Sequence, residues 1–173
     1  MTAEISRRLE NLIRLGTIAE VDYQNAKARV KSGAILTDFL PFATARAGDV
    51  KTWTPPSIGE QVFVFSMSGE LTNGVILTGI YQQSQAAPSQ NGQEHLIVFP
   101  DGAEIRYNHK SGALHIKAVN SLTIDCPQIT LNGNVELNGT LKSTGDQVAG
   151  TISQINHVHS GVMTGAGKTQ KPS

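Results

Sequence analysis

The chain of 173 residues is poor in aromatic side chains, at 5%, and carries no excess of either charge. Its 14 basic residues are balanced by 14 acidic ones, which argues against a nucleic-acid-binding protein, because such proteins usually display a basic face. A single cysteine, Cys126, excludes an intramolecular disulfide framework. No apolar run approaches the ~20 residues that span a bilayer, and the N-terminus lacks a signal-peptide core. We therefore expect a chain made in the cytoplasm without a signal peptide.

Patterns that carry catalysis are also scarce. The sequence shows no Ser/His/Asp set, no paired carboxylates and no complete phosphate-binding loop. The run from Gly165 to Thr169 resembles the end of such a loop. It lacks the first glycine at the required spacing, and neither a strand nor a helix is predicted beside it. We predict that the protein is not an enzyme and takes no small-molecule substrate.

The N-terminal half begins with a helical pattern and continues with strands. Apolar residues at helical spacing from Ile5 to Leu15 predict a short amphipathic helix ended by Gly16, which either packs on its own domain or docks on a partner. Weak alternation at 17–22 and 26–31 and strong alternation at 61–65 and 75–81 then indicate short strands. Five or six such strands in about 70 residues predict a small closed barrel, for which we expect the OB-fold.

The C-terminal half is a repeat of apolar pairs separated by Gly, Asn, Asp, Pro or Ser. The pairs are Leu96/Val98, Ile105/Tyr107, Leu114/Ile116, Leu122/Ile124, Ile129/Leu131 and Val135/Leu137, followed by Leu141. The step between pairs shortens from about nine residues to about six, which predicts very short strands and a tapering solenoid. Each pair buries too little apolar surface to order one chain, whereas three chains around one axis form a closed prism. A monomeric β-sandwich or a single-chain β-solenoid remains the alternative.

Two histidines follow the last repeat, in the run from Asn156 to Gly161. If this run is a strand, His157 and His159 share one face. On a threefold axis, three such pairs supply six nitrogens, which suits an octahedral transition metal such as iron or nickel. The other histidines lack a partner at ligand spacing, and we expect them on the surface; they are His95, His109 and His115. Asp146 precedes the pair, and calcium or another ion at that position stays open.

These features together resemble the phage baseplate assembly protein V family, the central membrane-piercing spikes of contractile phage tails and R-type pyocins. The resemblance rests on the short helix, a barrel containing the run from Trp53 to Val62, the Gly/Asn-cornered repeat and the terminal H-x-H, and it covers essentially the whole chain. It implies an all-β homotrimer: an N-terminal OB-fold barrel, then an intertwined triple-stranded β-helix and an apex with one iron ion held by six nitrogens of His157 and His159. No lysozyme domain is inserted, so the resemblance implies no cell-wall-degrading activity.

The implied organisation divides the chain into five segments. These are the N-terminal helix at 1–16, the OB-fold collar at 17–83, a linker at 84–94, the β-helix shaft at 95–145 and the apex at 146–173. The implied partners are two further copies, the baseplate hub and tail tube proteins, and transiently the host outer membrane, at the tail tip of a virion or pyocin particle. The alternative is an oligomeric OB-fold protein that binds single-stranded nucleic acid, because Lys27, Arg29 and Lys31 alternate along one predicted strand.

Overall fold

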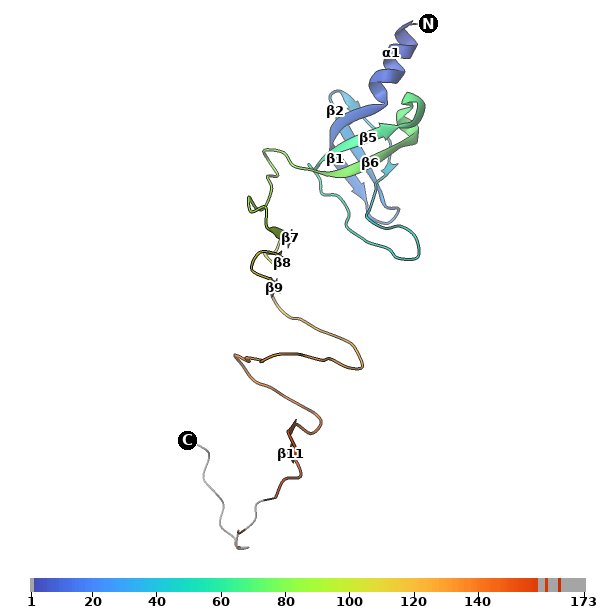
Figure 1. Cartoon of the computed structure of the whole chain (residues 1–173). Helices are drawn as coiled ribbons and strands as arrows, with labels where there is room; N and C mark the ends of the chain where they lie inside the picture. The colour runs from blue at the N-terminus through green and yellow to red at the C-terminus, as the bar shows by residue number, and fades with distance from the viewer. Residues whose placement is uncertain (1, 159–160, 162–164, 166–173) are drawn as a thin grey trace. The chain divides into compact units, whose positions relative to one another are not determined.

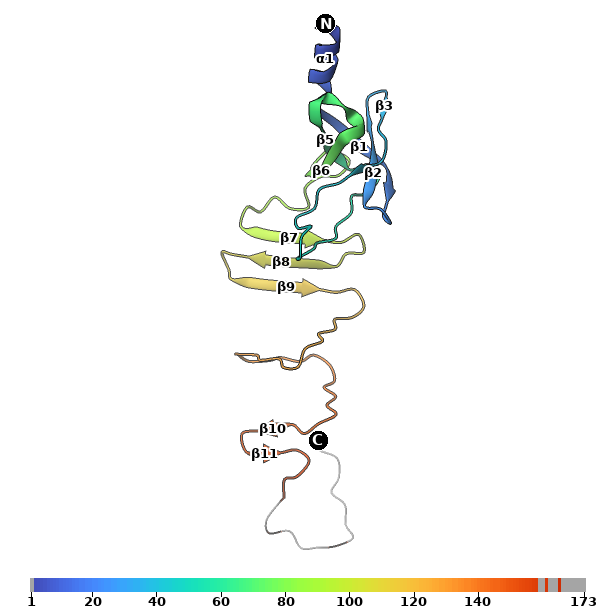
Figure 2. The same cartoon turned by 90° about the vertical axis from the view of Figure 1, so that its right-hand side faces the viewer.

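The computed structural model describes residues 2–158, 161 and 165, and its regular elements are mainly strands (Figures 1 and 2). In chain order the elements are α1 (Thr2–Asn11), β1 (Ile13–Asp22), β2 (Lys27–Ser32), β3 (Ile35–Leu36), β4 (Leu40–Pro41), β5 (Gln61–Ser66), η1 (Met67–Gly69), η2 (Leu71–Asn73), β6 (Gly74–Ile80), β7 (Glu94–Val98), β8 (Glu104–Asn108), β9 (Ala113–Lys117), β10 (Val148–Ala149) and β11 (Ile152–Ser153). The chain divides into two units, Met1–Leu122 and Thr123–Ser173. Within the described residues, no helix is both long and apolar enough to cross a membrane.

The first strands form a closed barrel, as the alternation predicts. The sheet order is β3-β2-β1-β5-β6, and β4 pairs with β2. A parallel bridge between Phe42 and Ile76, with the amide of Ala43 donating to the carbonyl of Ile76 at 2.7 Å, then joins the end of β4 to β6. Because this contact links both ends of the sheet, the barrel leaves few unpaired strand edges.

The barrel encloses one small aliphatic core. Its buried members are Ile18, Ala28, Val30, Leu40, Val62, Val64 and Ile76, with Val21, Phe42 and Leu71 partly buried against them. The buried members come from β1, β2, β4, β5 and β6, and in β2 and β5 they occupy alternate positions, so the period of two that predicted strands also selects the core face. The turn predicted between the two strongest strands is present as η1 and η2.

The predicted helix is shorter than its apolar spacing suggested. It ends at Asn11, and β1 begins at Ile13 and continues through Gly16, so the prediction that Gly16 ends the helix was wrong. A Cβ atom at Gly16 would lie 2.5 Å from Cγ1 of Val30 and 2.7 Å from the carbonyl oxygen of Lys31. The glycine therefore permits the close approach of β1 to β2. In the sequence alone, such a glycine looks the same as one that ends a helix.

Strands β7, β8 and β9 form a separate three-stranded antiparallel sheet (Figure 2). The register places Ile97 opposite Ile105, and Ile105 opposite Ile116. Residues directly opposite one another share a face, so these side chains form one apolar face. Leu96 and Val98 pair with Arg106 and Glu104 and lie on the other face. The prediction that Leu96/Val98 continue the apolar face was therefore wrong by one residue, which in a strand reverses the side.

Residues 118–147 form no strand within one chain, although apolar pairs recur there. The next strands are β10 and β11, which make a small hairpin with Val148 opposite Ser153. The single-chain solenoid considered as an alternative is therefore absent from this described segment.

Candidate functional site

One face of the β7-β8-β9 sheet is apolar and uncovered. It consists of Ile97, Ile105, Tyr107, Leu114 and Ile116, all of which are exposed. Soluble proteins seldom leave so continuous an apolar face in water, and such a face marks a site of association.

The opposite face of the same sheet is satisfied by polar contacts within the chain. The Glu94 side chain is only 5% exposed, accepts a hydrogen bond from Ser89 Oγ and lies 3.4 Å from the Arg106 guanidinium. Arg106 also pairs with Glu104 at 3.1 Å, and His115 Nδ1 lies 3.1 Å from Glu104. The hydrogen bond from Arg106, followed by that of His115, lowers the pKa of Glu104. The sheet therefore has one completed face and one face without a cover.

The apolar residues beyond this sheet are exposed as well. The exposed fraction of the residue lies between 52 and 69% for Val119, Leu122, Ile124, Ile129, Leu131, Val135, Leu137 and Leu141. Cys126 is exposed too, and its Sγ lies 3.3 Å from the carbonyl oxygen of Gln128. No described residue of the chain covers these side chains.

Of the two predicted metal ligands, only His157 lies within the described residues; His159 lies outside them. His157 follows the turn after β11 and is not in a strand, so a shared strand face with His159 does not follow from its position. Its Nδ1 lies 2.9 Å from the carbonyl oxygen of Ser153. A carbonyl only accepts, so Nδ1 carries the proton and Nε2 of the neutral ring is unprotonated. No three His, Cys, Asp or Glu side chains come together in the described part of the chain.

Asp146 has a structural role in the hairpin that precedes His157. Its Oδ1 accepts a hydrogen bond from the amide of Ile155 at 3.1 Å. The pKa of Asp146 is lowered, mainly by a hydrogen bond from Ser153 and further by backbone amides. The carboxylate thus ties the start of β10 to the residues after β11, and Ser153 in turn supplies the carbonyl that orients His157.

The cations that suggested nucleic-acid binding are only partly available. Arg29 donates from Nε to the carbonyl of Thr37 at 2.8 Å, and its guanidinium lies 3.7 Å from Glu20 and 5.7 Å from the centre of the Phe39 ring. Lys27 and Lys31 remain exposed beside it. The basic series is therefore interrupted at its centre by a residue that the barrel itself uses.

Helix α1 leaves its apolar side open. Ile5 and Leu9 are exposed and, with Leu12, line a shallow cavity of about 270 Å³. The other side is held by ions, because Arg7 and Arg8 both contact Glu4 and Glu70. The apolar side is therefore not packed on the barrel, and docking on a partner stays a prediction.

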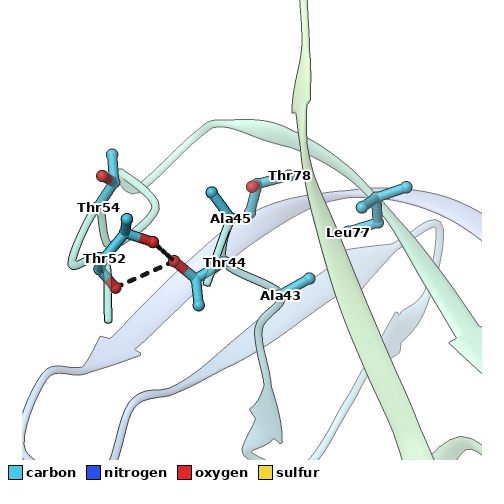
Figure 3. A pocket seen from close by; sticks show the side chains of 7 residues that line it. All are labelled: Ala43, Thr44, Ala45, Thr52, Thr54, Leu77 and Thr78. Atoms are coloured by element: carbon cyan, nitrogen blue, oxygen red, sulfur yellow. Dashed lines mark hydrogen bonds between the residues drawn. The ribbon is translucent and has the colours of Figure 1, made fainter. Parts of the chain in front are cut away.

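The loop 43–54, which the strand pattern did not single out, lines two cavities on the surface of the barrel. Thr44 Oγ1 lies 2.7 Å from Thr52 Oγ1 (Figure 3). The amide of Thr52 donates to the carbonyl of Arg46 at 3.0 Å, which closes a short hairpin. One side of this hairpin borders a cavity of about 410 Å³ lined by Ala43, Thr44, Ala45, Thr52, Thr54, Leu77 and Thr78. The other side borders a larger cavity of about 550 Å³ beside Phe42 and Trp53.

Two comparisons with known proteins agree on one class. Residues 14–81, which span the barrel strands β1 to β6, match the family model of the type VI secretion system and phage-baseplate injector OB domain. Over 202 aligned positions the chain is 31% identical to the spike protein of Escherichia phage P2, and the alignment covers 98% of this chain and 96% of that protein. The match therefore extends well beyond the barrel, through the repeat and the terminal segment.

Proposed function

Because the chain belongs to the baseplate assembly protein V family, we propose that it is the central spike of a contractile phage tail or pyocin particle. In this role it sits at the baseplate, at the tip of the tail tube, and passes through the host outer membrane when the sheath contracts. The observation that carries the proposal is the uncovered apolar face of the β7-β8-β9 sheet, together with the exposure of the apolar residues between 119 and 141.

Three copies of the chain are the cover that this surface requires. A homotrimer brings three apolar faces together around one axis and leaves the face with Glu94 and Arg106 outside, where its charges are already paired. In the same assembly, residues 118–147 find backbone partners in neighbouring copies and form the triple-stranded β-helix. The shaft is then a thin rod without lateral edges, which suits a part that is pushed through a membrane.

An iron ion at the apex fits the chemistry of the described residue. The Nδ1–H of His157 is held by the Ser153 carbonyl, which fixes the tautomer whose Nε2 binds a metal, and such a second contact is typical of metal-bound histidines. His157 and His159 of three chains would hold one iron ion with six nitrogens. When bound, the metal supplies a cross-link between the three chain ends. With all six positions taken by nitrogen, the site has no open position for a substrate, so its role is structural.

The remaining surfaces suit attachment to the particle. In the proposed assembly the barrel and α1 contact the baseplate hub and the tail tube, which is supported by the match of the barrel to the injector OB domain and by the exposure of Ile5 and Leu9. We assign no enzymatic activity, nucleic-acid partner or small-molecule substrate to the chain.

The mass of the purified full chain in solution tests the proposal. Light scattering after size exclusion should give about three times 18.5 kDa, and the trimer should persist on dilution. Elemental analysis of tag-free protein should give one iron per three chains, and metal should be released at acidic pH, because imidazole must be neutral to bind. A well-folded particle of 18.5 kDa would contradict the spike, whereas a trimer without metal would remove only the apex site.

A further inference from the structure

The cavity beside Trp53 is lined by the β1–β2 turn with Asn25 and Ala26, by residues at the end of β4, and by the segment from Thr44 to Trp53. Pro41 and Phe42 come from β4 and its continuation, where Phe42 is fixed by its bridge to Ile76. The 44–52 hairpin supplies the second wall, and Trp53 follows it, with its ring centre 6.0 Å from that of Phe42. At about 550 Å³ the cavity has the size of a site for a side chain or a small ligand.

Trp53 does not complete the core of its own domain. It is 58% exposed and is the only tryptophan of the chain. An exposed tryptophan on the wall of a preformed cavity is characteristic of binding surfaces, since Trp and Arg contribute most often to the energy of protein contacts.

The charges around the cavity have one sign. Arg46 and Lys51 are the only charged residues that line it, and Asp49 at the end of the hairpin does not. Neither Arg46 nor Lys51 forms an ion pair within the described part of the chain. An occupant that carries carboxylates beside an apolar group would therefore satisfy both the aromatic walls and the two cations.

We propose that this cavity, the Trp53 pocket, binds an acidic peptide segment that packs one large apolar side chain against Phe42 and Trp53 while its carboxylates pair with Arg46 and Lys51. The segment belongs to a protein that adjoins the barrel in the baseplate, and only this assignment of its owner rests on the proposed function. The pocket thus attaches and orients the barrel domain by a contact separate from the apolar face of β7-β8-β9.

A peptide suits the pocket better than a nucleic acid does. Single-stranded nucleic acid is bound by a track of cations with a series of stacking aromatics, and affinity grows with the number of phosphates neutralised. This pocket offers two cations and one aromatic pair tilted at 49°, with Ala26, Pro41 and Ala47 as aliphatic walls. These features favour a single inserted aliphatic or aromatic side chain.

Because Trp53 is the only tryptophan, its fluorescence reports directly on the pocket in the full-length protein. The probe is a capped hexapeptide of alternating aspartate and leucine; the control peptide carries lysine in place of aspartate. We expect a saturable change of Trp53 emission with the aspartate peptide only. The double variant R46E/K51E should weaken binding by at least tenfold, and K110E/K142E, which changes the net charge equally outside the pocket, should leave it unaltered. Circular dichroism confirms that both variants fold.

Several results would overturn the proposal: no saturable change with the aspartate peptide, equal binding of the lysine peptide, an equal loss in K110E/K142E, or tighter binding of oligothymidylate. Acrylamide quenching of the full-length protein without peptide is a further test. If Trp53 is already shielded from acrylamide in this sample, a second copy of this chain occupies the pocket and the proposal is wrong. If the peptide does not bind but the protein is a trimer, the spike proposal still holds. If the protein is a monomer but the peptide binds, the Trp53 pocket still holds and only the assignment of its partner to the baseplate is lost.

Discussion

Two adjacent residues of β7 offer a direct test of which sheet face is covered in the assembly. Ile97 is 44% exposed and Val98 48% exposed, but the register places Ile97 beside Ile105 and Val98 beside Glu104. Aspartate at either position disfavours the strand to a similar degree, so this cost cancels between the two variants. We predict that Ile97→Asp dissociates the trimer and that Val98→Asp does not.

The expected size of the effect follows from burial. Fully burying an isoleucine side chain contributes ~1.5–3 kcal/mol, so covering the exposed half of Ile97 contributes about 1 kcal/mol per chain. The substitution occurs three times in a trimer, and a loss of about 3 kcal/mol lowers the association constant roughly 100-fold. Three carboxylates brought into one closed apolar interface add a desolvation cost of the same sign. The loss for Ile97→Asp is therefore at least ~100-fold, and Val98→Asp lacks both contributions.

Sedimentation equilibrium of the wild type and the two variants across a dilution series measures this difference. The wild type and Val98→Asp should remain trimeric where Ile97→Asp is already monomeric. The reverse order would show that the face with Arg106 is the covered one. Equal behaviour of the two variants would refute the apolar face as the interface, whatever the mass of the wild type.

Three further predictions concern the two ends of the chain. His157→Ala should lose the metal and lower the thermal stability of the tip while the mass stays trimeric; a monomeric variant would mean that the metal, not the sheet, holds the chains together. Gly69→Ala should release α1 from η1 while the barrel stays folded, because a Cβ atom there would overlap the backbone of Arg8; hydrogen exchange of residues 2–11 measures this. Gly33→Ala is its control, since Gly33 also has a positive φ, at 62°, but no neighbour within 4 Å. Hydrogen bonds from Arg7 and then Arg8 lower the pKa of Glu4 from 4.5 to about 2, so this contact is fully present above pH 4.5 and is lost as the pH falls towards 2. Protection of α1 should fall over that range, and Glu4→Gln should lack the pH dependence.

The barrel was predictable because its signals agree with one another. The alternation at 61–65 and 75–81 and the turn residues between them each favour the same hairpin, and the structure has it as β5 and β6. The end of α1 was not predictable in the same way. Gly16 fits the end of a helix as well as the crowded centre of β1, and only the position of Val30 distinguishes the two.

The sheet face and the Trp53 pocket were missed for different reasons. The run from Glu94 to Val98 has three consecutive apolar residues, so its pattern of two fits either face, and the pairing with β8 decides. The pocket joins Phe42 to residues of a hairpin that carries no strand alternation. An available signal was the only tryptophan, close in sequence to two cations, Arg46 and Lys51, within a loop.

The sequence predicts strands in residues 118–146 that one chain by itself does not form. The predicted apolar pairs are present and exposed, but the segment makes no backbone–backbone hydrogen bond with any described residue of its own chain. The segment thus lacks both backbone–backbone hydrogen bonds and cover for its apolar side chains, and one event, pairing with neighbouring copies in register, provides both. A second chain alone would leave part of the backbone and of the apolar side chains uncovered, so all three chains are needed. We therefore expect the shaft to become ordered only as the trimer forms, and local opening of the shaft to require the three chains to separate together.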